Sequence, residues 1–291
     1  MSPFPAYPLT PFPPLVVNAA LTGMTPTRER VPHVPLDAGE IADDATRCFE
    51  AGARIMHLHA RDGDGRPTWR RAAYGDLIGE IRERCPGVIV CATTSGRADP
   101  DLDHRTDVLN LEGEQRPDMA SLTLGSVNFP SGPSTTSIVH VEELVRRMRD
   151  AGVRPELEIF DLGHAHLAHR LIDKGLLEPP LYANLMLGFP NAAPADARSL
   201  TALVDALPSG TSWAAAGFGA FQDITTALAV AMGGHVRTGL EDNPFLDHST
   251  REPATNDALV KRAIAHAQVL RRPIADPEQA QMTVGLLQTA R

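Results

Sequence analysis

The chain has 291 residues, of which 43% are apolar and 22% charged, a composition typical of a folded globular protein. Its 27 Lys and Arg against 36 Asp and Glu give a formal net charge of −9, which disfavours nucleic acid and anionic lipid as partners. Three cysteines without C-x-x-C spacing exclude a disulfide framework and favour a reducing cytoplasm. The sequence shows neither a signal peptide nor an apolar run long enough for a membrane span.

Short apolar runs and longer amphipathic runs alternate along the chain. The apolar runs predict eight strands, over residues 15–20, 54–59, 88–94, 119–124, 156–160, 182–187, 212–216 and 235–239. The amphipathic runs predict helices, over residues 37–52, a stretch ending near 84, then 137–152, 165–174, 224–232 and 256–270. At the first helix Asp37 is the expected N-cap, and Glu40 follows at capping-box spacing.

Strict alternation of apolar strands with helices predicts a parallel sheet that is buried on both faces. Eight strands are the number that closes a (β/α)8 TIM barrel, and the length suits one such domain. An open doubly wound sheet is the alternative. We therefore expect a proline-rich N-terminal arm over residues 1–14 and a barrel over residues 15–291.

Two histidines end the second predicted strand. His57 and His59 are two residues apart, so their side chains point to the same face of the strand. At the C-terminal end of a barrel strand that face borders the mouth, where active sites of this fold lie. A pair of imidazoles suits zinc, but a hydrogen-bonded pair at the rim would show the same spacing.

Two acidic residues follow the eighth predicted strand. Since the eighth strand of a closed barrel pairs with the first, Glu241 can reach the second strand and complete a His2Glu metal site with His57 and His59. Asp242 would then be placed as a base, and Arg237 as a fixed cation for a carboxylate. Two solvated loop acids are the alternative interpretation.

Other candidates carry weaker signals. Hydroxyl groups after the third and fourth strands, among them Thr93 and Ser121, suit a substrate carboxylate or only cap helices. The histidines between 164 and 169 fit a helix surface or cap, and the glycines of 217–219 give a weak phosphate-loop signal. We expect Cys91 to be a buried structural thiol and His235 a packed strand residue.

From about residue 16 to 285 the chain resembles the β-keto acid cleavage enzymes. The resemblance rests on six segments: NAALTGM (18–24), EAGARIMHLHARD (50–62), TTSGR (93–97), MASLTLGSVNF (119–129), PELEIFDLGH (155–164) and GGHVRTGLEDN (233–243). The H-L-H-x-R-D block paired with G-G-H-V-R-x-G-L-E-D-N is its most specific part.

The resemblance implies zinc held by His57, His59 and Glu241, with Asp242 as the base and Arg237 as its charged partner. It implies substrate contacts from Thr93 and Ser121, where the family has serine and threonine respectively. The implied reaction condenses a β-keto acid with acetyl-CoA and releases acetoacetate and a new acyl-CoA. It further implies a homo-oligomer, usually a tetramer.

One substrate-binding position departs from the family's named member. Thr25 stands where that enzyme, which acts on 3-keto-5-aminohexanoate, has a glutamate suited to the substrate ammonium group. A β-keto acid without that amine is therefore expected. Nearby Arg28 and Arg30 suit an anionic substrate tail, the phosphates of coenzyme A, or solvent alone. A metal-dependent aldolase or hydrolase acting on a keto acid, and a non-catalytic acyl-CoA-binding or keto-acid-binding barrel, are the alternatives.

Overall fold

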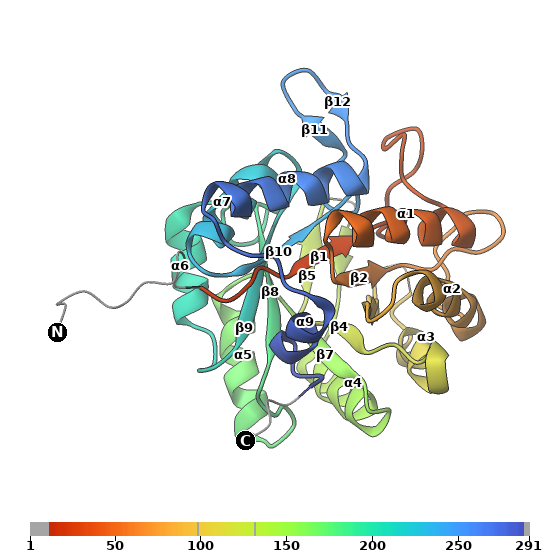
Figure 1. Cartoon of the computed structure of the whole chain (residues 1–291). Coiled ribbons are helices and arrows are strands. Elements are labelled where there is room, and N and C mark those ends of the chain that lie inside the picture. The colour runs from red at the N-terminus through yellow and green to blue at the C-terminus, as the bar shows by residue number, and fades with distance from the viewer. Residues whose placement is uncertain (1–11, 98, 131, 288–291) are drawn as a thin grey trace.

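The computed structural model describes residues 12–97, 99–130 and 132–287, and its centre is a closed parallel barrel (Figure 1). The hydrogen-bonded strand order around it is β1-β10-β9-β8-β7-β4-β3-β2. The barrel strands are β1 (Val17–Ala20), β2 (Ile55–Leu58), β3 (Ile89–Ala92), β4 (Met119–Thr123), β7 (Arg154–Ile159), β8 (Tyr182–Leu187), β9 (Ser212–Gly217) and β10 (His235–Thr238). The predicted (β/α)8 barrel is confirmed, and the open-sheet alternative is wrong.

Helices surround this barrel, and one of them, α9 (Pro277–Thr283), lies at the N-terminal ends of the strands. They are α1 (Ala38–Ala51), α2 (Arg71–Arg84), α3 (Leu102–Thr106), α4 (Ile138–Asp150), α5 (Leu162–Asp173), α6 (Ala197–Asp205), α7 (Gln222–Ala231), α8 (Asn256–Val269) and α9 (Pro277–Thr283). Three single 3-10 turns, Asp107–Asn110, Gly113–Gln115 and Gly219–Phe221, link some of them. The expected helices are all present within a few residues, whereas the short helices α3, α6 and α9 escaped prediction.

The structure forms one half of the capping box that the sequence predicted at the start of α1. Asp37 caps the helix by accepting a hydrogen bond from the Glu40 backbone N–H at 2.9 Å, as predicted. Glu40 does not return the bond to the cap residue, because its carboxylate accepts from the Leu36 N–H at 2.9 Å. That carboxylate also pairs with Arg28, which ties the loop after β1 to the helix.

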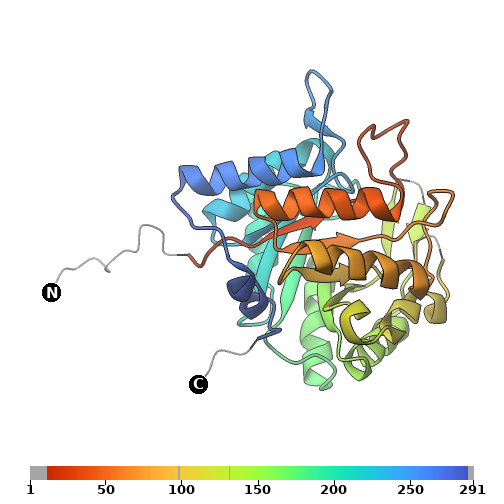
Figure 2. The same cartoon turned by 45° about the vertical axis from the view of Figure 1, so that its right-hand side comes forward.

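The two ends of the barrel are closed differently. At the N-terminal ends of the strands, Ala280 of α9 and nearby Val284 pack in one buried cluster with Val16 and Ile55. At the opposite end, the loop after β1 and the hairpin β11–β12 (Phe245–Asp247, Glu252–Pro253) project together beyond the barrel (Figure 2). The hairpin β5–β6 (Val127–Phe129, Gly132–Ser134) follows β4 at this end. The mouth is thus bordered by loops and hairpins that strand periodicity did not predict.

Two further predictions concern the N-terminal arm and membrane-spanning segments. Of the expected arm over residues 1–14, residues 1–11 lie outside the described part. Pro13 accepts a hydrogen bond at its carbonyl from the buried Arg272 side chain, at 2.8 Å. No helix within the described ranges has the length and apolar character needed to cross a membrane.

Candidate active site

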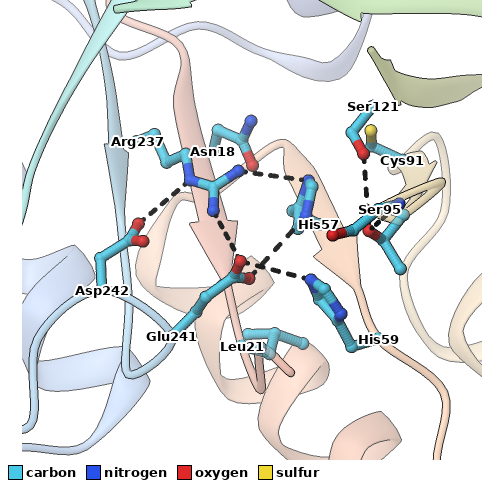
Figure 3. Close-up of polar contacts among 12 residues, drawn as sticks. Asn18, Leu21, His57, His59, Cys91, Ser95, Ser121, Arg237, Glu241 and Asp242 are labelled. Atoms are coloured by element: carbon cyan, nitrogen blue, oxygen red, sulfur yellow. Dashed lines mark hydrogen bonds and ion pairs between the residues drawn. The ribbon is translucent and has the colours of Figure 1, made fainter. Parts of the chain in front are cut away.

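Three predicted metal ligands meet at the C-terminal end of the barrel (Figure 3). The strand pairing explains the encounter, because β1 separates β10 from β2 and aligns Ala20 with His57. The His57 Nε2 lies 3.8 Å from one Glu241 carboxylate oxygen, and the His59 Nε2 lies 3.3 Å from the other. The two rings point to the same side with centroids 5.3 Å apart, as the i, i+2 spacing predicted.

The polar atoms of this group fit a bound metal ion. Both ring nitrogens of His59 and the Oε2 atom of Glu241 are buried, and among the described residues they find no hydrogen-bond partner. Buried polar atoms rarely stay unsatisfied, and two of these, the His59 Nε2 and the Glu241 Oε2, belong to the group that meets here, so the group suits a metal ion. One ligand atom from each of His57, His59 and Glu241 can be chosen so that all lie within 4.8 Å of one another. A His2Glu set of this kind suits zinc and leaves a coordination position open.

Glu156 of β7 fixes the orientation of His57. Its side chain is fully buried, and its Oε2 atom lies 2.8 Å from the His57 Nδ1. Burial alone would raise the pKa of Glu156, but the His57 ring and then the Arg237 guanidinium lower this pKa to about 2. The ionised carboxylate therefore favours the His57 tautomer with its proton on Nδ1, in which the lone pair of Nε2 is available in the shared space.

Arg237 connects the acidic residues of the site. Its guanidinium is 1% exposed, and its Nη2 lies 2.9 Å from Glu241 while its Nε donates to Asp242 at 3.0 Å. The Nη1 atom lies 3.4 Å from a carboxylate oxygen of Glu158. We expected Arg237 to face a substrate carboxylate, and in the structure four protein carboxylates already lie within 4.0 Å of it, because Glu156 adds a contact at 4.0 Å to those of Glu158, Glu241 and Asp242. Its contact with Asp242 brings together the two residues that the resemblance proposed as charged partner and base.

Asp242 has the surroundings of a general base. It lines the same pocket as Glu241 and is 4% exposed. Burial raises the pKa of Asp242, the Arg237 guanidinium opposes the rise, and the nearby Glu241 adds to it. The Gly219 N–H donates to the Asp242 backbone carbonyl at 2.8 Å, so one amide of the predicted phosphate loop is already used to hold this residue.

The predicted substrate-binding residues lie at different depths. Thr25 and Thr93 both line the pocket, with Thr25 exposed at its rim. Ser121 is 2% exposed and lies behind Thr93, to which its hydroxyl donates at 3.5 Å. Arg30 lines the pocket, whereas Arg28 is paired with Glu40 at the start of α1.

The other candidates take the structural roles that we favoured. His164 is buried in the first turn of α5, where its Nδ1 accepts from the Phe160 N–H at 3.3 Å. His235 accepts from the Val16 N–H at 3.0 Å. Cys91 is buried beside Glu156, and burial raises the pKa of this thiol well above its ordinary value.

Sequence reasoning missed two acidic residues of the site, Glu156 and Glu158. Both lie on β7, two residues apart, and therefore point to the same side of that strand. The signal was available in the run PELEIF, where two carboxylates interrupt an otherwise apolar barrel strand. The i, i+2 rule that identified His57 and His59 would have placed them inside the barrel as well.

Comparison with known proteins confirms the resemblance. The model of the β-keto acid cleavage enzyme family matches residues 14–286, and the chain belongs to this family. A 3-keto-5-aminohexanoate cleavage enzyme of Fusobacterium nucleatum is 36% identical over 94% of this chain and 98% of its own length. A 3-oxoadipate:acetyl-CoA acetyltransferase of Cupriavidus necator is 35% identical over 94% and 95%.

More distant proteins share the fold. A 3-dehydrocarnitine:acetyl-CoA trimethylamine transferase of Rhizobium meliloti is 31% identical over 93% of this chain and 96% of its own length. Among solved structures, the apo form of ObcA superimposes with a TM-score of 0.75 at 20% identity, over 87% of this chain and 66% of that longer one. The names of the three curated relatives differ in the acid that is transformed, so the family alone does not define the substrate.

Proposed function

We propose that this protein is a metal-dependent acyltransferase that cleaves a β-keto acid with acetyl-CoA, and that zinc is its metal. The observation that carries the proposal is one pocket in which His59 and Glu241, which form a ligand set with His57, lie beside the buried pair of Arg237 and Asp242. The names of the curated relatives support acetyl-CoA as the second substrate. The cysteine usage keeps a cytoplasmic location as an expectation, and the resemblance keeps a homo-oligomer, usually a tetramer, whose subunit number light scattering measures.

The protein side chains have separate tasks in this proposal. His57, His59 and Glu241 would hold the ion, which supplies Lewis-acid chemistry for a ketone. Asp242 takes a proton from the carbon between the keto and carboxylate groups of the substrate, and Arg237 keeps the Asp242 carboxylate aimed at the pocket. Thr93 offers its hydroxyl to the substrate carboxylate. Ser121 supports Thr93 from behind, and Thr25 borders the pocket at the rim.

The bonds of the proposed reaction balance without an oxidant or reductant. The carbanion left by Asp242 attacks the acetyl carbon of acetyl-CoA, and the C–S bond breaks to release the coenzyme A thiolate. This thiolate attacks the original keto carbon, and the adjacent C–C bond breaks to give a new acyl-CoA and the acetoacetate carbanion. Asp242 returns its proton to that carbanion.

Replacement of Asp242 by Asn tests the proposal. Without the base we expect turnover to fall about 10²- to 10⁴-fold while the metal content stays unchanged. Mass spectrometry of acetoacetate and acyl-CoA measures turnover, and elemental analysis measures the metal content. The matched control is Asp247→Asn in β11, where the carboxylate accepts from Ser249 in a turn. Full activity of the Asp242 variant, or cleavage of keto acids without acetyl-CoA, would contradict the proposal.

A further inference from the structure

A cluster of aromatic rings borders one side of the pocket. Phe129 of β5 lies there together with three residues at or after the ends of β7, β8 and β9: Phe160, Phe189 and Phe218. We call these four residues the phenylalanine wall. Thr25, Thr93 and two of the metal-ligand candidates, His59 and Glu241, line the same pocket. The pocket therefore has a polar part supplied by β1, β2, β3 and β10 and an apolar part supplied mainly by β7, β8 and β9.

The rings of the wall hold one another in place. Phe189 stacks on Phe218 with centroids 4.3 Å apart, and Phe129 meets Phe160 and Phe189 edge-on at 5.8 and 5.5 Å. The Arg97 guanidinium covers Phe129 at 4.1 Å from its centroid. Aromatic pairs in these arrangements stabilise one another beyond simple burial, so the wall is formed before any ligand arrives.

The charges of the pocket do not favour a cationic tail. Within the described ranges its carboxylates are Glu158, Glu241 and Asp242, and each lies within 3.4 Å of Arg237. Thr25 contributes a neutral hydroxyl at the rim where the family's named member has a glutamate. An ammonium group beside the wall would therefore lose its hydration without gaining a carboxylate of its own.

We propose that the phenylalanine wall binds the substituent of the β-keto acid, and that this substituent is an uncharged alkyl or aryl group. The inference rests on the proposed function, because the polar part of the pocket takes the keto and carboxylate groups. One methylene group more or less in an apolar pocket changes kcat/KM by about 10-fold or more. An apolar tail that reaches the wall therefore gains much, whereas an ammonium tail of similar length must be desolvated there.

A substrate series measures this preference with the metal-loaded wild-type protein and acetyl-CoA. The series contains 3-oxopentanoate, 3-oxohexanoate, 3-oxooctanoate and 3-oxo-3-phenylpropanoate, with 3-keto-5-aminohexanoate and 3-oxoadipate as charged members. We expect kcat/KM to rise about 10-fold from the ethyl to the propyl substituent, and the best apolar acid to exceed 3-keto-5-aminohexanoate by about 100-fold and to remain better than 3-oxoadipate. A charged acid as the best substrate would overturn the inference and leave the proposed function intact.

Two matched variants link the preference to the wall. Phe129→Ala removes a wall residue, and Phe245→Ala removes a half-buried phenylalanine from the hairpin β11–β12, where Arg251 covers its ring at 5.2 Å. We expect the first variant to lose about 10-fold in kcat/KM for the best apolar acid, mainly through KM, and the second to retain it. Equal effects of the two variants would overturn the assignment of the wall.

The failure of the proposed function gives a different result. If no acid of the series yields acyl-CoA, the proposed reaction is wrong, and the wall is tested by calorimetric binding of the same acids. Tighter binding of the apolar members that Phe129→Ala abolishes supports an apolar subsite without that reaction. Equal binding of apolar and charged members overturns the subsite as well.

Discussion

Replacement of Glu156 by Gln tests how the barrel prepares its metal site. In the wild type, Glu156 accepts hydrogen bonds from the Asn18 side chain at 2.6 Å and from the Cys91 thiol at 3.2 Å, beside its contact with His57. A glutamine has one acceptor oxygen and a donating NH2 group in place of the second oxygen. At least one of Asn18, His57 and Cys91 would then face the NH2 group of the glutamine instead of an acceptor oxygen. If that partner is His57, the ring must carry its proton on Nε2, the atom needed for the metal.

The expected loss follows from the contact that is removed. A hydrogen bond to an ionised carboxylate stabilises a structure by about 1.5–3 kcal/mol. Loss of such support for a ligand histidine typically weakens metal binding about 10- to 100-fold, which corresponds to about 1.4–2.7 kcal/mol. We therefore expect Glu156→Gln to bind zinc about 10- to 100-fold more weakly, as measured by competition with a chelator of known affinity.

Two further variants make the result interpretable. Glu158→Gln changes the neighbouring carboxylate of the same strand, which contacts Thr123 and Arg237 rather than His57, and should keep nearly the wild-type zinc affinity. His59→Ala removes a ligand and should abolish tight binding. Unchanged zinc affinity in a folded Glu156→Gln protein would refute the reasoning. So would an equal loss in Glu158→Gln, because the effect would then reflect charge alone.

Two more predictions concern stability. Gly239→Ala should lower the free energy of unfolding by about 3 kcal/mol or more, because Gly239 has φ +151° and an added Cβ would lie 2.1 Å from the Ala20 carbonyl oxygen. Denaturant titrations measure this loss, and the control Gly63→Ala, which has open space around the added Cβ, should leave the free energy of unfolding unchanged. Burial lowers the pKa of His235 to about 3 in the folded protein. As the pH falls below about 6.5, the histidine is therefore protonated in the unfolded chain but not in the folded one. This difference should lower the free energy of unfolding by about 2 kcal/mol between pH 7 and 5. His235→Asn can still accept a hydrogen bond from the Val16 N–H but does not titrate, so its free energy of unfolding should lack this decrease between pH 7 and 5. Equal pH profiles of stability for the two proteins would contradict the prediction.

The repetition of apolar strands and amphipathic helices determined the barrel from the sequence. Each barrel strand is surrounded by other protein on both faces, so its run of apolar residues stands out without knowledge of its neighbours. The same local rules placed His57 and His59 on one side of a strand and put Glu241 near them through the closure of the barrel. Short-range physics sufficed for these features because they depend on the period of a strand and on one pairing rule.

Only the tertiary structure decided what surrounds the ligands. Glu156 and His57 are 99 residues apart in the chain, and Arg237 meets Glu158 across 79 residues, so no local pattern reports either contact. The phenylalanine wall likewise depends on the hairpin β5–β6, whose short strands are below the length at which periodicity is informative. The sequence by itself determined the barrel and which residues could bind a metal. The packing of distant strands determined which of their atoms are held in place, because burial and pairing of charges depend on all the neighbours at once.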